Sequence, residues 1–190
     1  MKRNFHTFLL AIFVLTIIHS CGPYSKLYRS DNTDRNYNGI LSDSTYNTLK
    51  LFLVKTTSKK LNDTLLIKYD YNNETCWDLL DQKVDDYILG FVTRHKERLQ
   101  KVEKTRPNVS AFNFREPGNN LNKIIQLNNL IIIDSSKQLF NLIFSERCTC
   151  GSSIIVMPDK RFVFLRSDSH SELLDLSKEQ IDEILNKKYQ

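Results

Sequence analysis

Apolar residues recur along the chain with two spacings, which predict where helices and strands form. Residues 78–103 place apolar side chains three and four positions apart, which is typical of a long amphipathic helix. Residues 64–71 form a nearly continuous apolar run typical of a buried strand, and residues 109–114 alternate apolar and polar side chains as a strand does. Residues 46–59 fit both a helix and a short strand, so both assignments stay open there.

The second half of the chain contains shorter elements with distinct boundaries. Residues 130–133 form a short apolar block that predicts a strand, and the Asp-Ser-Ser segment at 134–136 is typical of a helix N-cap. Two β-type runs, 153–157 and 161–166, are separated by the turn-forming sequence Pro-Asp-Lys. Because the two runs are so close in sequence, we expect them to pair as an antiparallel hairpin.

The chain closes with a helix whose start is specified by a local motif. Ser177 and Gln180 have the spacing of a capping box, and the apolar residues that follow have helical spacing. The elements therefore run strand, helix, strand, helix, hairpin, helix, which is the order of the thioredoxin fold. We predict an α/β protein, a thioredoxin-like three-layer α/β/α sandwich with a central mixed sheet of about four to five strands.

Two segments resemble a known family. Residues 129–144 and 150–164 are similar to the second half of membrane-anchored, thioredoxin-like disulfide oxidoreductases and peroxiredoxin relatives. In these proteins a buried strand ends in Asp before a helix, and a later strand and turn lead into the last strand. The resemblance covers roughly residues 60–190, and we assign the thioredoxin-like domain to residues 46–190.

The resemblance breaks down at the position of the family's chemistry. Family members carry Trp-Cys-x-x-Cys after the first core strand, where the positive end of a helix lowers the pKa of the leading thiol. In the alignment that the resemblance implies, Asn73 stands at the position of the nucleophilic Cys, and Cys76 stands at the position of the second Cys. The family's cis-proline falls on Gly151, which follows Cys150. The chain therefore lacks the standard dithiol.

The N-terminus carries an export signal. Two basic residues precede an apolar run at 8–18, which is too short for a permanent membrane span and ends in Ile-His-Ser-Cys at 18–21. This tetrapeptide resembles the bacterial lipobox, in which the Cys is acylated, with palmitate for example, and becomes the mature N-terminus. We predict a lipoprotein signal peptide at 1–20 and a membrane lipid anchor on Cys21. The alternative is a soluble exported protein in which Cys21 is an ordinary thiol.

The segment after the anchor lacks the apolar residues needed for a core. Residues 21–45 are rich in Asn, Asp, Ser and Tyr, so we predict a flexible tether. The alternative is that Tyr24, Tyr28 and Tyr37 dock on the domain. No acidic run follows Cys21, which favours a periplasm-facing protein in the bacterial cell envelope.

Composition and motifs exclude several classes of function. Lys and Arg number 27 and Asp and Glu 22, but the two signs are interspersed, so no basic stripe indicates a nucleic-acid partner. The chain has no Gly-rich phosphate loop, no Gly-x-Ser-x-Gly and no His-Glu-x-x-His, so no cofactor is predicted. The sequence does not indicate an oligomeric state. Asp85-Asp86 and the polar cluster at 168–172 are interpreted as a solvated helix face and a polar loop.

No metal site is predicted either. A zinc site at the cysteines would need a His, and His95 lies about 28 Å from Cys76 along the predicted helix. We expect His170, in the loop after the last strand, at the far end of the sheet from Cys150.

The cysteines are interpreted through the resemblance. In a thioredoxin fold the loop before the penultimate strand packs beside the first long helix, which would bring Cys148 or Cys150 near Cys76. An oxidising compartment favours one disulfide and one remaining thiol, and Cys76 with Cys150 is the preferred pair. Cys148 is the alternative to Cys150 in this pair, and a Cys148–Cys150 bridge is possible but strained.

Two functions follow from these observations. The first is a binding or accessory module, anchored to the membrane by lipid, that holds an envelope protein partner in the groove at the loop end of the fold. The alternative is an atypical thiol-disulfide oxidoreductase with Cys76 and Cys150 as catalytic residues. The sequence favours the first, since the standard dithiol is absent and a fold by itself does not specify a function.

Overall fold

The structure is a computed structural model that describes residues 35–72, 74, 82–118, 122–127 and 129–187. The predicted signal peptide, Cys21, Asn73 and Cys76 lie outside these residues, as does most of the predicted tether. Among the helices within the described ranges, none is both long and apolar enough to span a membrane.

Six strands form one mixed sheet in the order β1-β6-β5-β2-β3-β4. Strands β2, β3 and β4 are parallel, whereas β5 and β6 form an antiparallel hairpin, with β5 pairing with β2 and β6 with β1. The strands are β1 (Asn36–Ile40), β2 (Thr64–Asp70), β3 (Val109–Arg115), β4 (Ile131–Ile133), β5 (Gly151–Val156) and β6 (Arg161–Leu165).

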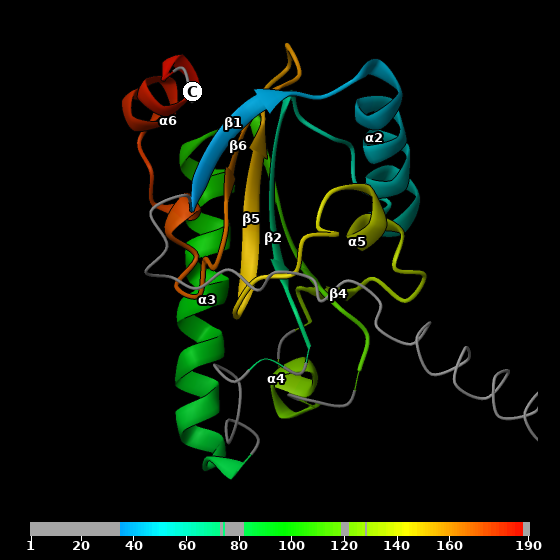
Figure 1. Ribbon diagram of the computed structural model, residues 1–190. Coiled ribbons are helices and arrows are strands. Elements are labelled where there is room, and N and C mark those ends of the chain that lie inside the picture. Colours follow the sequence, from blue (N-terminus) through cyan, green and yellow to red (C-terminus); the bar gives the residue numbers. More distant parts are fainter. Residues whose placement is uncertain (1–34, 73, 75–81, 119–121, 128, 188–190) are drawn as a thin grey trace, which may run out of the picture.

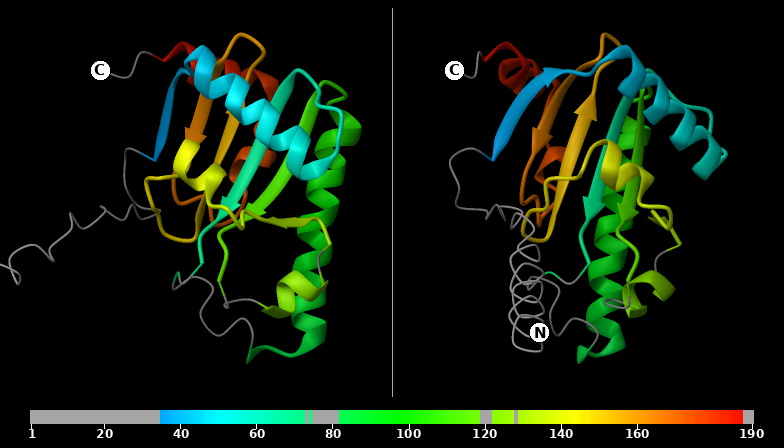
Figure 2. Two further views of the ribbon diagram at one scale, coloured as in Figure 1. Left: turned by 90° about the vertical axis from the view of Figure 1, so that its right-hand side faces the viewer. Right: turned by 45° about the vertical axis from the view of Figure 1, so that its right-hand side comes forward.

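Helices cover both faces of this sheet (Figures 1 and 2). Two of them, α2 and α5, pack on one face, and α3 and α6 pack on the other. The helices are α2 (Asp43–Thr57), α3 (Asp85–Thr105), α4 (Asn122–Leu127), α5 (Gln138–Leu142) and α6 (Lys178–Asn186), with a short 3-10 helix, η3 (Glu172–Leu174).

The arrangement confirms the predicted thioredoxin-like three-layer sandwich. Helix α3 connects the parallel strands β2 and β3, the β5–β6 hairpin adds to the other side of β2, and α6 follows the hairpin. The sheet has six strands in the described residues rather than four to five, because β1 and the short β4 extend its two edges.

Strand β2 supplies side chains to two separate cores. Leu65, Ile67 and Tyr69 pack with the buried residues of α2 and α5, and Leu66 packs with those of α3 and α6. Burial of a side chain of this size contributes about 1.5–3 kcal/mol to folding. Because β2 is buried on both faces, any charged residue on it lies inside the protein.

Local sequence signals account for the helix boundaries. Within the segment 46–59, left open between helix and strand, residues 46–57 belong to α2 and Ser58 is its C-cap. The N-cap of this helix, Ser42, accepts a hydrogen bond from the Thr45 N–H at 3.1 Å. The capping box of Ser177 and Gln180 is formed at the start of α6. Helix α3 begins at Asp85, later than the predicted residue 78, and residues 78–81 lie outside the described part of the chain.

The predicted tether at 21–45 is wrong at its C-terminal end. Strand β1 pairs with β6, and the Tyr37 ring lies 5.0 Å from that of Phe164, with the Arg166 guanidinium 4.3 Å above it. The side chain of Asn38 also donates to the backbone of α6. Docking of Tyr37 on the domain, the alternative, is therefore correct for this residue, because its ring and strand pairing offset the cost of ordering.

Candidate functional site

The face of the sheet under α3 changes from apolar to polar along its length. Leu66, Ala111 and Ile155 are neighbours on β2, β3 and β5 and belong to the apolar core. Two residues further toward the carboxyl end of β2, Lys68 lies between Asn113 of β3 and Ser153 of β5. In the next row, Asp70 lies between Arg115 and Gly151. The polar side chains in these two rows are at most 6% exposed, so they form the floor of an interior site.

Lys68 and Asp70 form a buried ion pair in this floor. Lys68 is 1% exposed and Asp70 6%, and Nζ lies 3.0 Å from Oδ1. Gly151 provides the space for them, because a Cβ at this position would lie 2.7 Å from Lys68 Nζ and 2.8 Å from Asp70 Oδ1. A residue other than glycine would thus require the pair to move.

Helix α3 forms the opposite wall. His95 Nε2 lies 2.9 Å from Asn113 Nδ2, so the amide donates and the ring nitrogen accepts. Burial lowers the pKa of His95 and nearby Lys68 and Arg98 act in the same direction, while Asp70 and Asp168 oppose them. Both the burial and the hydrogen bond from the Asn113 amide favour the neutral form of the His95 ring.

The loop after β6 completes the site. Asp168 is fully buried and accepts hydrogen bonds from Ser153 Oγ and from the Glu172 N–H, both at 2.5 Å. Arg98 of α3 donates to the carbonyl oxygens of His170 at 2.6 Å and Ser171 at 3.0 Å. The predicted polar loop at 168–172 is thus held to β5 and α3 by hydrogen bonds.

The expected position of His170 is wrong. Antiparallel pairing places the end of β6 beside the start of β5, and the Asp168 N–H donates to the Gly151 carbonyl oxygen at 2.8 Å. The loop that carries His170 therefore lies at the same end of the sheet as Cys150, not at the far end.

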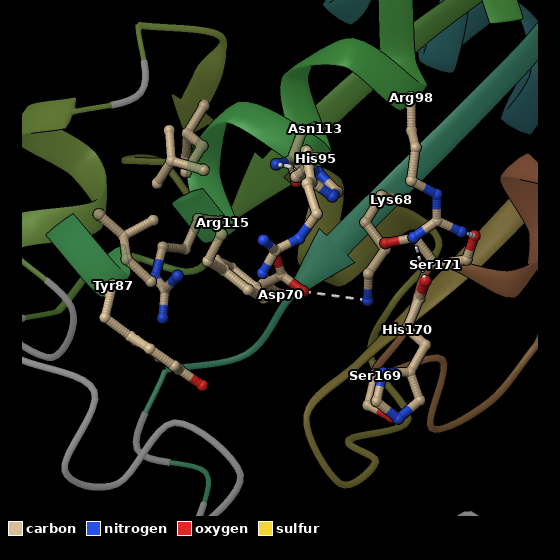
Figure 3. Close-up of a pocket in the computed structure, with 15 residues that line it drawn as sticks. Lys68, Asp70, Tyr87, His95, Arg98, Asn113, Arg115, Ser169, His170 and Ser171 are labelled. Atoms are coloured by element: carbon tan, nitrogen blue, oxygen red, sulfur yellow. Dashed lines mark hydrogen bonds and ion pairs between the residues drawn. The ribbon is translucent and has the colours of Figure 1, made fainter. Parts of the chain in front are cut away.

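These elements enclose a pocket of about 400 Å³. Figure 3 shows Lys68, Asp70 and Arg115 grouped at the strand ends, with His170 and Ser169 on one side and Tyr87 on the opposite side. The described lining residues are Lys68, Asp70, Tyr87, Phe91, Val92, Arg94, His95, Arg98, Asn113, Arg115, Ile124, Ile131, Ser169, His170 and Ser171.

A second charged network holds the ends of β2 and β3 together. Arg147 contacts Glu74 Oε1 at 3.1 Å and Glu116 Oε2 at 2.6 Å, and the Asn72 N–H also donates to Glu116 Oε2 at 2.9 Å. Burial opposes ionisation of Glu116, but the hydrogen bonds from Arg147 and Asn72 outweigh it and lower its pKa. This network fixes the loop before β5 to the two parallel strands.

The described cysteines differ in state. Cys150 is disulfide-bonded and packs with Ile88 and Val92 in the first turns of α3, where the resemblance placed it. Cys148 is a buried free thiol, so the two are not bridged to each other. Burial raises the pKa of Cys148, which makes it a poor nucleophile. Because Cys76 lies outside the described residues, the Cys76–Cys150 pairing stays a prediction.

Other candidate positions show no catalytic arrangement. Asp85 and Asp86 are exposed in the first turn of α3, as expected of a solvated helix face. Within the described ranges, no group of three or more His, Cys, Asp or Glu side chains could hold a metal ion.

The sequence reasoning missed the polar floor of the pocket, although a signal was present. On the first of the two predicted strands, Lys68 and Asp70 alternate with the same spacing as Leu66, and on β3 Asn113 and Arg115 do so with Ala111. Charged residues at alternate positions of a buried strand must face a partner or a cavity. Combining this alternation with parallel pairing of the two strands would have indicated the site.

No protein-family model and no curated protein matches the sequence. Among solved structures, the chain is similar to a secreted Mycobacterium tuberculosis disulfide oxidoreductase homologous to E. coli DsbE, with 8% identity, 66% of this chain and 81% of that chain covered, and a TM-score of 0.37. It is also similar to MTB DsbF, with 10% identity, coverages of 65% and 82%, and a TM-score of 0.38. The assignment of the thioredoxin-like fold rests on the order and direction of the strands.

Proposed function

We propose that this chain is a lipid-anchored protein of the bacterial cell envelope whose thioredoxin-like domain acts as a binding or accessory module. The observation that carries the proposal is the pocket of about 400 Å³ beneath α3, lined by Lys68, His95 and Arg98. It lies where β2 and β3 end, and the carboxyl ends of parallel strands are the usual ligand site of open α/β sheets.

The state of the thiols supports binding rather than thiol catalysis. A thiol enzyme needs an accessible thiolate, whereas burial raises the pKa of Cys148, and Cys150 is only 6% exposed. Asn73 occupies the position of the family's nucleophile in the alignment. The pocket, by contrast, is lined in its described part by ionic, aromatic and aliphatic side chains.

An insulin-reduction assay with dithiothreitol tests this function. A binding module leaves the rate at the uncatalysed level, and the wild-type chain and Cys150→Ser behave alike. A wild-type chain that accelerates the reaction, with the acceleration lost in Cys150→Ser, would overturn the proposal.

The lipid anchor is tested separately by fractionation. The Cys21→Ser chain should appear in the soluble envelope fraction or remain an unprocessed precursor, because its acyl chains are absent. Membrane retention equal to that of the wild type would contradict the anchor.

A second function, an atypical thiol-disulfide oxidoreductase, is favoured by one observation. Cys150 is disulfide-bonded and packs against the first turns of α3, near a helix terminus that favours negative charge. In that case Cys76 would attack a substrate disulfide and Cys150 would resolve the mixed disulfide. The insulin assay distinguishes this function from the binding module.

A further inference from the structure

The floor of the pocket retains hydrogen-bonding capacity that the described protein groups do not use. The Lys68 ammonium has three N–H donors. It is ion-paired with the Asp70 carboxylate, but none of its donors forms a hydrogen bond with a described residue. Because buried polar groups are nearly always satisfied, the unused Lys68 donors suit a ligand group that accepts hydrogen bonds.

The positive charge of the lining favours a negatively charged ligand group. Its described side chains include four Lys or Arg residues and one carboxylate, Asp70, which is already opposite Lys68. Arg98 is also paired with Asp175, which lies outside the lining, so the pocket keeps a net positive charge. Arg94 and Arg98 lie on the α3 wall and Arg115 at the end of β3. In a partly buried site these cations attract an anion and repel a cation.

The rest of the lining is apolar. Phe91 and Val92 of α3, Ile124 of α4 and Ile131 of β4 form a continuous wall, which also packs against Cys150. Tyr87 lies across the pocket from His170 (Figure 3). A volume of about 400 Å³ accommodates a small molecule, and the apolar wall fits a ligand with a hydrocarbon body.

We propose that this pocket binds a small organic anion, with a carboxylate or phosphate head placed near Lys68 and Arg98 and an apolar body against Phe91 and Ile124. The inference rests on the proposed binding function and names the ligand class for its site.

Calorimetric titration of the full chain with matched probes tests this ligand class. Benzoate and phenyl phosphate carry the head and the body, benzyl alcohol lacks the charge, benzylammonium reverses it, and inorganic phosphate lacks the body. At least one aromatic anion should bind about tenfold more tightly than benzyl alcohol and benzylammonium. Phenyl phosphate should exceed inorganic phosphate, and the better aromatic anion identifies the head group.

Three variants test whether the anion binds in this pocket. Arg94 is exposed at the rim, so Arg94→Gln should keep the fold and weaken the anion about threefold. Lys104→Gln removes the same charge from the same helix outside the pocket and should leave affinity unchanged. Lys68→Met should abolish binding while the chain still melts cooperatively.

The ligand class is wrong if neither aromatic anion binds, or if benzyl alcohol binds as tightly as benzoate. Equal loss of affinity in Arg94→Gln and Lys104→Gln would also exclude this pocket. Any of these results leaves the insulin assay unaffected, so a failed ligand class is distinguishable from a failed binding function.

Discussion

The ammonium of Lys68 lies 3.0 Å from the carboxylate of Asp70, two residues further along β2, and both groups are buried. Side chains two apart on a strand share a face, so the pair lies side by side beneath α3. Asp70 is also the register partner of Gly151 on β5. Formation of the ion pair thus depends on the absence of a side chain on the neighbouring strand.

Gly151→Ala should destabilise the fold by about 1–3 kcal/mol, because the new methyl group would lie 2.5 Å from the Tyr69 carbonyl oxygen and within 3 Å of the ion pair. Gly90→Ala is the matched control, since among the described residues its Cβ would meet only Arg94 Nη1, at 3.6 Å, in a helix interior that favours alanine. Urea denaturation measures both variants. Equal stability of Gly151→Ala and the wild type would show that the pocket floor has room for a methyl group at this position.

Removing one partner of the ion pair should cost more than removing both. Lys68→Met leaves the Asp70 carboxylate buried without its counter-charge, which typically costs about 3–5 kcal/mol. The double variant Lys68→Met with Asp70→Asn removes both charges and should recover most of that loss. A double-mutant cycle from denaturation curves measures the coupling, and additive losses would contradict a direct pair.

His95 should make the fold less stable in mild acid. Its pKa is lowered in the folded state, so the unfolded chain, with an ordinary value of about 6.5, takes up the proton first as the pH falls. The stability from neutral His95 is therefore present above about pH 6.5 and is lost as the pH falls toward the folded-state value. The free energy of unfolding, followed between about pH 7.5 and 5, should fall less in His95→Gln than in the wild type.

Replacement of the exposed His170 by Gln leaves His95 in place and serves as the control for this measurement. An equal pH dependence in the wild type and His95→Gln would show that His95 is not the group responsible.

Tyr37→Ala should destabilise the fold by about 2–4 kcal/mol, because the ring stacks on Phe164 and lies beneath Arg166. Tyr87→Ala removes an exposed ring and should change stability by less than about 0.5 kcal/mol. Thermal unfolding compares the two variants. If Tyr37→Ala were as stable as Tyr87→Ala, the segment around Tyr37 would behave as the predicted flexible tether and not as a docked strand.

Local signals explain what the sequence predicted. Residues 64–71, 109–114 and the Ser177–Gln180 capping box carry their own pattern, and each formed the predicted element. Strand β1 was missed because its partner, β6, lies more than a hundred residues away and its polar sequence has little apolar signal. A strand that depends on distant pairing is not specified by local propensity.

The pocket was missed for a related reason. Lys68, Asn113 and Ser153 become neighbours only once the order and register of β2, β3 and β5 are known. The resemblance indicated the cysteines as the candidate site, whereas the charged residues on buried strands carry the more specific signal.

The reduction potential of the Cys150 disulfide, titrated against glutathione after its partner is mapped by mass spectrometry, tests most directly whether this domain is a binding module. For a binding module we expect a bridge to Cys76 with a potential below about −300 mV and no exchange with small thiols, as for a structural disulfide. A potential well above this value, with rapid exchange, would contradict the binding module and indicate a thiol-disulfide oxidoreductase.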